Sequence, residues 1–394
     1  MATATAAPAN QSAGGSSSST TKGKQAAAPM LRPFFPGTLD LETHTYVKTG
    51  TLTTAQVPLD TFYPKTNGFL VDMWIEVTAT AATNAATVAF NEDYPAKAIA
   101  VFQLSDTGGQ PILGPMDGNE LATFVKWGGF SFSDDMRQSQ TYSAVTGAGA
   151  DGGSFSFMLH IPIQFVRREP LGPLPNTNSN NAYALDITMS TLAQIYSVAP
   201  TNAPTYTVKV YQDSYRQSSG KDAQGNATVT TPPGLGAVLY LRRNTMDLSA
   251  GSVDEQISQQ EGSYRCLHFV LRDSNGSRAT GDTDWPDPVQ IYLNNDVPYD
   301  RTKNYWIRRQ ERDFGYVAAA GSPGGRDLGT FTLPFITDHE LKAGSEDRYK
   351  YLSVSAADTL GFRGVIGGTG THVLTTMFDF VRPPGGNIKG LTAR

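Results

Sequence analysis

The chain has 394 residues and a formal net charge of −5, from 31 basic and 36 acidic residues. This length allows two or three domains, and the slight acidic excess argues against a protein that coats DNA or RNA, because such proteins usually carry a basic surplus. Only 17% of the residues are charged, whereas 39 are glycine and 24 are proline, a mixture typical of many short strands joined by turns.

Residues 1–29 are rich in Ala, Ser, Thr and Gly. They lack the basic and apolar regions of a secretory signal, and no apolar run in the chain approaches the ~18 residues that span a bilayer. Because this composition buries too little apolar surface to offset chain entropy, we expect residues 1–36 to form a flexible arm. The apolar patch "MLRPFFPG" offers Leu31, Phe34 and Phe35 for docking onto a neighbouring subunit; the alternative is a passive tail.

Apolar residues alternate with polar ones in the segments that follow, as in strands with one face in a core. In "FLVDMWIEVT" the pattern places five apolar residues on one face: Phe69, Val71, Met73, Ile75 and Val77. In "GSFSFMLHIPIQF" every second residue from Phe155 to Phe165 is apolar. Pro162 falls on the opposite face and indicates a sheet edge or a bulge.

The stretch "GSFSF" at Gly153 resembles "GTFTL" at Gly329. Further strand-like stretches begin at Tyr183 and Thr205 after the first, and at Tyr349 and Thr371 after the second. The spacings are 30 and 22 residues in one case and 20 and 22 in the other. Three similar strands in the same order indicate an internal duplication, although strand-rich segments can also resemble one another by chance.

We therefore predict an all-β chain of two consecutive eight-stranded jelly rolls with few short helices and long loops. The predicted divisions are an arm over 1–36, a first jelly roll over 37–216, a linker over 217–236, a second jelly roll over 237–383 and a tail over 384–394. Helices are expected over 300–314, capped by Asp300, and over the shorter segment 252–260.

No set of residues in the sequence indicates catalysis, so we expect no enzyme activity, no cofactor and no metal. None of the five histidines lies within thirty residues of another, unlike the clustered metal ligands of two-domain cupin enzymes. The only cysteine, Cys266, lies in an apolar run and is expected in the core. Trp127 and Trp285 are candidates for exposed aromatic residues that stack on sugars.

Two charged clusters allow more than one interpretation. "GDTDWPDP" carries Asp282, Asp284 and Asp287 and could hold calcium, but it lacks the glycine and terminal glutamate of an EF-hand loop, which favours a solvated loop. The second cluster consists of basic and aromatic residues of one predicted helix: Tyr305, Trp306, Arg308, Arg309 and Arg312. The arginines are expected to form salt bridges to neighbouring loops or subunits rather than a nucleic-acid patch.

Several strings, in order along nearly the whole chain after the arm, resemble the major capsid proteins of tailless phages with an internal membrane, the tectivirus type. They are "NGFLVDMWIEVTA" (67–79), "YPAKAIAVFQLSDTGGQ" (94–110), "GSFSFMLHIPIQF" (153–165), "YTVKVYQDSYRQ" (206–217), "YRCLHFVLRDSNGS" (264–277) and "YDRTKNYWIRRQERDFG" (299–315). No single string is diagnostic; their order and spacing carry the resemblance.

The resemblance implies a double jelly-roll bacteriophage capsid protein, assembled in the host cytoplasm, that forms pseudo-hexagonal homotrimers in an icosahedral virion shell. The implied partners are neighbouring capsomers, penton or minor capsid proteins and, through the arm, the inner viral membrane, with no direct nucleic-acid contact. Long loops near 131–153 and 273–298 would form outward towers or trimer contacts. The alternative from another class is a carbohydrate-binding or adhesive β-sandwich, such as a phage spike or surface lectin.

Overall fold

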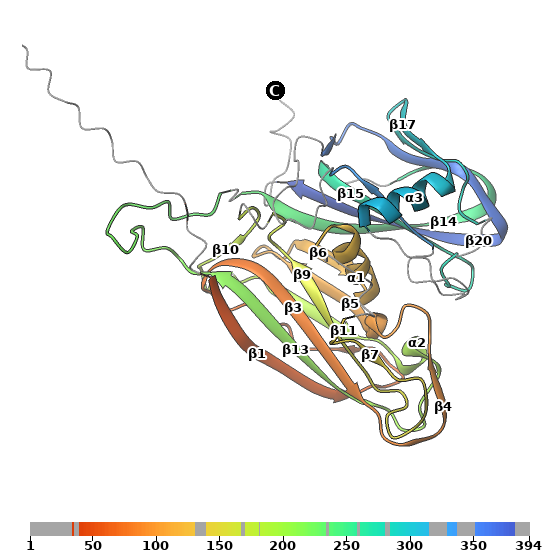
Figure 1. The fold of residues 1–394 in the computed structure, drawn as a ribbon, viewed down its shortest axis with the longest axis horizontal. Coiled ribbons are helices and arrows are strands. Elements are labelled where there is room, and N and C mark those ends of the chain that lie inside the picture. Colours follow the sequence, from red (N-terminus) through yellow and green to blue (C-terminus); the bar gives the residue numbers. More distant parts are fainter. Residues whose placement is uncertain are drawn as a thin grey trace, which may run out of the picture.

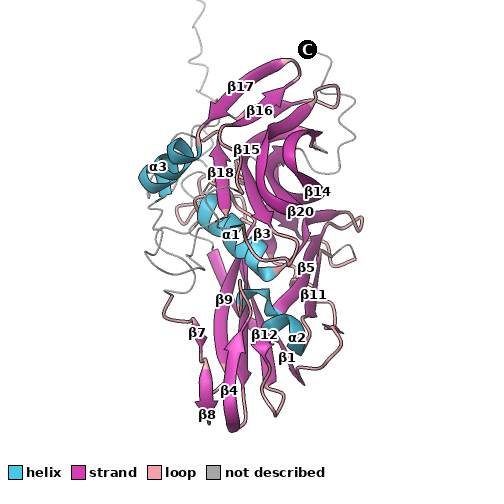
Figure 2. Cartoon of the chain, turned by 90° about the vertical axis from the view of Figure 1, so that its right-hand side faces the viewer, coloured by secondary structure: helices cyan, strands magenta, loops and turns pink. Residues whose placement is uncertain are grey.

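The computed structural model describes residue 34 and residues 39–130, 139–166, 170–180, 182–233, 236–257, 261–279, 284–314, 329–336 and 351–382. Two units built mainly of β-strands lie side by side, with the N-terminal unit drawn below the C-terminal one in Figure 1. Figure 2 shows α3 (Lys303–Phe314) at one side of the molecule and α1 (Gly118–Trp127) in the middle, where the two units meet. No helix among the described residues is long and apolar enough to cross a membrane.

The first unit has two antiparallel layers. One layer has the order β1 (Leu39–Thr51), β13 (Thr205–Tyr215), β3 (Gly68–Thr80), β9 (Phe155–Pro162) and β7 (Ser143–Ala144), with β10 (Leu174–Asn176) also on β3. The other has the order β2 (Val57–Pro58), β11 (Ala184–Met189), β5 (Ile99–Ser105) and β6 (Pro111–Met116). A smaller sheet contains β12 (Tyr196–Val198), β4 (Asn84–Phe90) and β8 (Gly147–Gly149).

The second unit repeats this arrangement with longer strands. One layer has the order β14 (Val238–Gln256), β20 (Leu360–Arg382), β15 (Gly262–Arg272) and β18 (Thr330–Pro334), with β19 (Leu352–Val354) also on β15. The other halves of β14 and β20 continue into the second layer, where β20 pairs with β16 (Val289–Leu293) and β16 with β17 (Asp296–Arg301). A register shift between Ser249 and Gly251, which has φ +114°, divides the two halves of β14.

The residue pairing shows that the two units are structural repeats. Gly68 and Gly262, both with positive φ, open β3 and β15, and three residues later each strand has one extra residue opposite its partner. The residue after the bulge is Asp72 in β3 and Cys266 in β15. Asp72 lies opposite Pro162, the last residue of β9, and Cys266 lies opposite Pro334, the last residue of β18. Because the glycine, the bulge and the end of the neighbouring strand occur at equivalent positions in both units, the residue pairing supports the predicted duplication.

The alignment predicted from sequence is correct for one strand and wrong for two. Thr205 and Thr371 are equivalent, because Asp213 and Asp379 lie opposite equivalent residues of β3 and β15. The residues of β9 and β18 are offset by 172 (Pro162 to Pro334) rather than the predicted 176 (Gly153 to Gly329). The stretch from Tyr349 contains β19, which pairs with β15 as β10 pairs with β3, so its counterpart is β10 and not β11.

The bulge in β3 also corrects the predicted face of that strand. Leu70, rather than Phe69 or Val71, joins Met73 in the main core. Because Val71 is the extra residue between the pairs Asp72–Asp213 and Leu70–Ser214, side chains before it change faces. The predicted strand through Phe165 ends earlier, at Pro162, where the ladder with β3 ends.

The helices are α1 (Gly118–Trp127), α2 (Leu192–Ile195), α3 (Lys303–Phe314) and the 3-10 turn η2 (Ala96–Ala98). The predicted helix over 300–314 is therefore present, but Asp300 is not its cap: it belongs to β17, and Tyr305 donates its backbone N–H to the hydroxyl of Thr302. The helix predicted over 252–260 is wrong where the structure describes it, because residues 252–256 continue β14.

Candidate functional site

The junction between the two units is the most elaborate polar site that the structure describes. Strand β6 of the first unit lies parallel to β14 of the second, with Leu113 opposite Leu241 (Figure 1). The ladder between these strands has this one residue pair, and Pro111 and Pro115 of β6 have no backbone N–H to donate to a longer ladder. The guanidinium of Arg242 donates to backbone carbonyls of β6, including those of Ile112 (3.1 Å) and Gly114 (3.0 Å).

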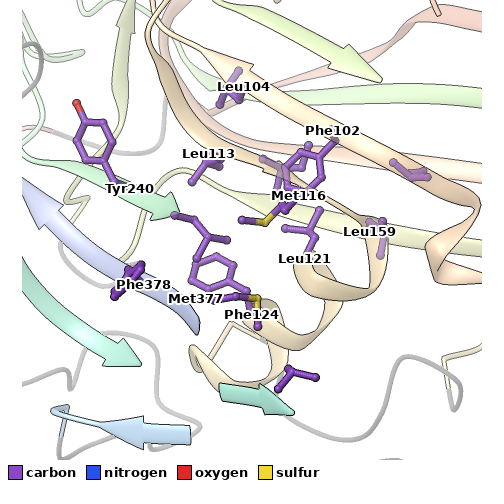
Figure 3. Packing of buried hydrophobic residues seen from close by; sticks show 14 of the residues in the cluster. Phe102, Leu104, Leu113, Met116, Leu121, Phe124, Leu159, Tyr240, Met377 and Phe378 are labelled. Carbon is purple, nitrogen blue, oxygen red and sulfur yellow. The ribbon is translucent and has the colours of Figure 1, made fainter. Parts of the chain in front are cut away.

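Apolar packing continues through the junction without a break. Figure 3 shows Leu113 and Met116 of β6 and Phe124 of α1 facing Met377 and Phe378 of β20. All five side chains are buried and belong to one cluster that extends through both units. Because burial of one large apolar side chain stabilises by about 1.5–3 kcal/mol, this shared core ties the two units together.

Helix α1 positions an acidic residue against the second unit. Asp117 accepts the backbone N–H of Glu120 (2.8 Å), and the Glu120 side chain accepts the N–H of Asp117 (2.8 Å), which forms a capping box. Glu120 also accepts two hydrogen bonds of 2.9 Å from Arg243 of β14. Burial, followed by the neighbouring Glu120 carboxylate, raises the pKa of Asp117 to about 7.

A second ionic contact joins the segment before η2 to the second unit. The Asp93 carboxylate lies 2.5 Å from Arg272 and 2.9 Å from Arg278, and Glu92 accepts the backbone N–H of Arg278 at 2.8 Å. Burial alone would raise the pKa of Asp93, but the two guanidinium groups outweigh it and lower the pKa. Removing one partner of such a buried pair typically costs about 3–5 kcal/mol, because the other charge stays buried.

The C-terminal end of α1 covers a buried polar group in the second unit. Arg265 lies 2.6 Å from the Asp379 carboxylate and donates to the carbonyl of Gly128 (3.2 Å), and the Phe130 ring lies 5.0 Å from its guanidinium. Potential metal ligands of Cys266, His268 and Asp379 lie within 4.8 Å of one another. The guanidinium of Arg265 already supplies the positive charge beside Asp379, so we assign these residues to the junction.

The residues predicted for arm docking are only partly described. Leu31 and Phe35 lie outside the described residues. Phe34 is buried against its own chain, with ring centroids 6.2 Å from Phe69 and 5.8 Å from Tyr215, and Val71 completes this cluster. Docking of Phe34 onto a neighbouring subunit stays a prediction.

The aromatic residues predicted to be exposed are not. Trp127 is 1% exposed and Trp285 is 2% exposed, and Trp285 stacks on Phe331 with ring centroids 3.8 Å apart. Both tryptophans therefore belong to the core, which removes the residues that motivated a sugar-binding surface. Cys266 is buried, as predicted.

The two charged clusters have structural roles in the described residues. Asp282 lies outside those residues, and Asp287 accepts the backbone N–H of Lys303 at 3.1 Å, where α3 begins. Arg309 and Arg312 both contact Asp313 within the same helix, at 2.8 and 2.6 Å. For these two arginines the structure shows a contact within α3 in place of the predicted salt bridges to neighbouring loops, and the predicted salt bridges to neighbouring subunits stay a prediction.

The sequence alone did not predict the junction. Glu92 and Asp93 contact arginines about 180 positions away, so nothing near them in the sequence indicates a partner. A weak signal was present in Asp117 and Glu120, whose spacing is that of a capping box.

Comparisons with known proteins place this fold. No protein-family model and no curated protein matches the sequence. Among solved structures, the STIV major capsid protein has a TM-score of 0.56 at 15% identity, with 86% of this chain and 97% of that chain covered. A chain in the atomic structure of Sulfolobus Turreted Icosahedral Virus has a TM-score of 0.57 at 13% identity, with 87% of this chain and 92% of that chain covered. The PBCV-1 virus capsid gives 0.53 at 15%, with 87% and 94% covered.

The likeness covers nearly the whole of each chain, and it confirms the predicted fold class. The protein is an all-β double jelly roll. Its fold is that of viral major capsid proteins, as the resemblance in the sequence implied.

Proposed function

We propose that this chain is a major capsid protein that forms pseudo-hexagonal homotrimers, and that these trimers tile an icosahedral shell around an internal membrane. The observation that carries the proposal is the fixed junction between two structurally equivalent units. A threefold trimer of such a chain presents six similar units, so it fills a hexagonal position in a shell with one gene product. The virion is then its location, after assembly in the host cytoplasm.

The divisions of the chain follow from this proposal. The arm over 1–36 and the tail over 384–394 flank jelly rolls over 37–216 and 237–383, and the linker over 217–236 joins them. Leu31, Phe34 and Phe35 are the proposed docking residues of the arm on a neighbouring capsomer, with Phe34 packed against Phe69 and Tyr215 of its own chain before assembly. Penton or minor capsid proteins and the inner viral membrane are the further partners, with no direct contact to nucleic acid.

A structural role without enzyme activity is consistent with the described residues, whose best-organised charged groups are used to join the two units. The competing carbohydrate-binding function has lost its two candidate tryptophans, which are buried.

Size-exclusion chromatography with light scattering tests the proposal on the full chain. A particle of about three times the chain mass of 42.3 kDa supports it. A stable monomer that binds glycans in an array contradicts it.

A further inference from the structure

The repeat identifies equivalent positions on the outer faces of the two main layers. In the first unit Trp74 pairs with Tyr211, and the equivalent pair in the second unit is His268 with Met377. Two residues further along, the pair Asp72–Asp213 is equivalent to the pair Cys266–Asp379. The first unit therefore carries a platform, defined here as Asp72, Trp74, Glu76, Tyr211 and Asp213, that corresponds to the surface beneath α1 in the second unit.

In the second unit this surface is covered. The Phe124 ring of α1 lies 6.2 Å from His268, and the carbonyl of Trp127 lies 3.9 Å from Cys266. As a result His268, Met377 and Asp379 are completely buried.

In the first unit the equivalent surface is partly open within the described part of the chain, although Asp72 is buried and lies 3.0 Å from His160. Trp74, Tyr211 and Asp213 are all partly exposed. Beside Trp74 lies a hollow of about 280 Å³, which Met158 and His160 also line. The same position in the repeat is thus a buried interface in one unit and an aromatic, acidic surface in the other.

Helix α3 is the second unit's counterpart of α1. Each helix begins two residues after the end of the equivalent strand, β6 or β17, and each buries an apolar residue at the same position, Leu121 in α1 and Trp306 in α3. On this alignment Arg309 and Arg312 of α3 correspond to Phe124 and Trp127, the residues of α1 that cover the second unit. Figure 2 shows α3 at the surface of the molecule.

Arg309 and Arg312 differ from their counterparts in being exposed. The side chain of Arg309 is 27% exposed and that of Arg312 is 68% exposed, whereas Phe124 and Trp127 are buried. Among the described residues, the face of α3 that corresponds to the junction face of α1 is therefore partly exposed, with both arginines in contact with Asp313 of the same helix.

The charges of the platform and of α3 are complementary. The platform carries three carboxylates, Asp72, Glu76 and Asp213, with Lys209 beside them. The sequence of α3 has four basic residues, Lys303, Arg308, Arg309 and Arg312, against two acidic ones. Within the chain the signs are reversed, since acidic Glu120 of α1 meets basic Arg243 of the second unit.

We propose that α3 of one protomer covers the platform of the next protomer, as α1 covers the second unit within each chain. The partner of this surface is a second copy of the chain, which places its Arg309 over the ring of Trp74 and its Arg312 beside Asp213. Internal and intersubunit junctions then alternate around a ring of six jelly rolls. This inference rests on the proposed homotrimer and identifies the surfaces that close it.

A charge exchange in the full-length protein tests the contact. Arg312→Glu and Asp213→Arg should each shift the light-scattering mass from trimer towards monomer, with an apparent dissociation constant raised at least tenfold. The double variant should restore the trimer, because the opposite charges face each other again. Lys221→Glu, at an exposed linker position, is the control for charge change and should leave the trimer unchanged.

A cysteine pair tests the same contact where a charge variant fails to fold. In a Cys266→Ala background, Arg312→Cys together with Asp213→Cys should give a covalent trimer on a non-reducing gel, whereas either cysteine alone should not. A wild-type monomer would overturn the proposed trimer itself. A wild-type trimer that tolerates both charge reversals and gives no crosslink would overturn only this assignment of its surfaces.

Discussion

The carboxylate of Asp93 contacts the guanidinium of Arg272 at 2.5 Å, although 179 residues separate them in the chain. Arg278 contacts the same carboxylate at 2.9 Å, so one buried acidic residue of the first jelly roll binds two arginines of the second. Together with the Glu120–Arg243 pair and the shared apolar core, this contact makes the two jelly rolls one body. The proposed pseudo-hexagonal trimer requires a fixed angle between the two units, which these contacts would provide.

Replacing Asp93 should weaken the whole fold. Asp93→Ala removes the nearest carboxylate from the buried Arg272 and Arg278 and leaves only Glu92, 3.5 Å from Arg278, so we expect the free energy of unfolding to fall by about 3–5 kcal/mol. Urea denaturation followed by tryptophan fluorescence measures this loss. Asp60→Ala, which removes a pair with Lys48 at an 80% exposed carboxylate, should cost less than about 1 kcal/mol. Equal losses in the two variants would contradict a structural role for the Asp93 contact.

The junction should also respond to pH through Asp117. Its pKa in the folded state, raised to about 7, lies above that of the unfolded chain, so between these values the folded protein holds a proton that the unfolded chain has released. Stability from this group is therefore present at low pH and is lost as the pH rises towards 7, with a slope of up to about 1.4 kcal/mol per pH unit.

The variant Asp117→Asn isolates that effect, because asparagine can still cap α1 but does not titrate. The difference in unfolding free energy between wild type and variant should change between pH 4 and pH 7. Asp151→Asn, at an exposed carboxylate, is the matched control. A difference that stays constant over this range for Asp117→Asn would show that Asp117 titrates normally.

Trp285 should behave as a core residue and not as a sugar-binding one. Trp285→Ala should cost about 3–5 kcal/mol, because the indole is buried against Phe331. Differential scanning calorimetry measures the loss, and Tyr63→Ala, at a side chain 62% exposed, should have little effect. Glycan binding by wild type that disappears in a stably folded Trp285→Ala variant would favour the carbohydrate-binding function.

The arm should act in shell assembly and not in folding. Deleting residues 1–29 should leave trimers intact and reduce the yield of closed shells, since the deletion spares Phe34 and its contacts with Phe69 and Tyr215. Light scattering reports the trimer, and electron microscopy of assembly reactions reports the shells. Normal shell yield from the deleted chain would leave the arm without this role.

Alternating patterns in the sequence predicted the strands and their duplication but not the register between copies. The predicted match of Gly153 with Gly329 differs from the observed one by four residues. An even shift keeps every side chain on its predicted face, so the pattern of apolar residues cannot detect it. The error at Phe69 and Val71 has another cause, because a single extra residue in β3 reverses the faces before it.

The junction could not be predicted in the same way. Its ion pairs join residues that are more than a hundred positions apart, such as Glu120 with Arg243, and each residue alone has the appearance of an ordinary surface charge. The burial of Trp127 and Trp285 could not be predicted either, because the sequence around a single aromatic residue does not show whether its side chain is exposed or lies in the core. The residues of the junction become neighbours only when the two units are folded and packed against each other.

The central claim is that two equivalent jelly rolls per chain give three chains a hexagonal outline. Class averages of purified capsomers by electron microscopy test it most directly. We expect a particle with six lobes and threefold symmetry, in which the lobes alternate between the two units. Monomers, or trimers with only three lobes around the axis, would contradict it.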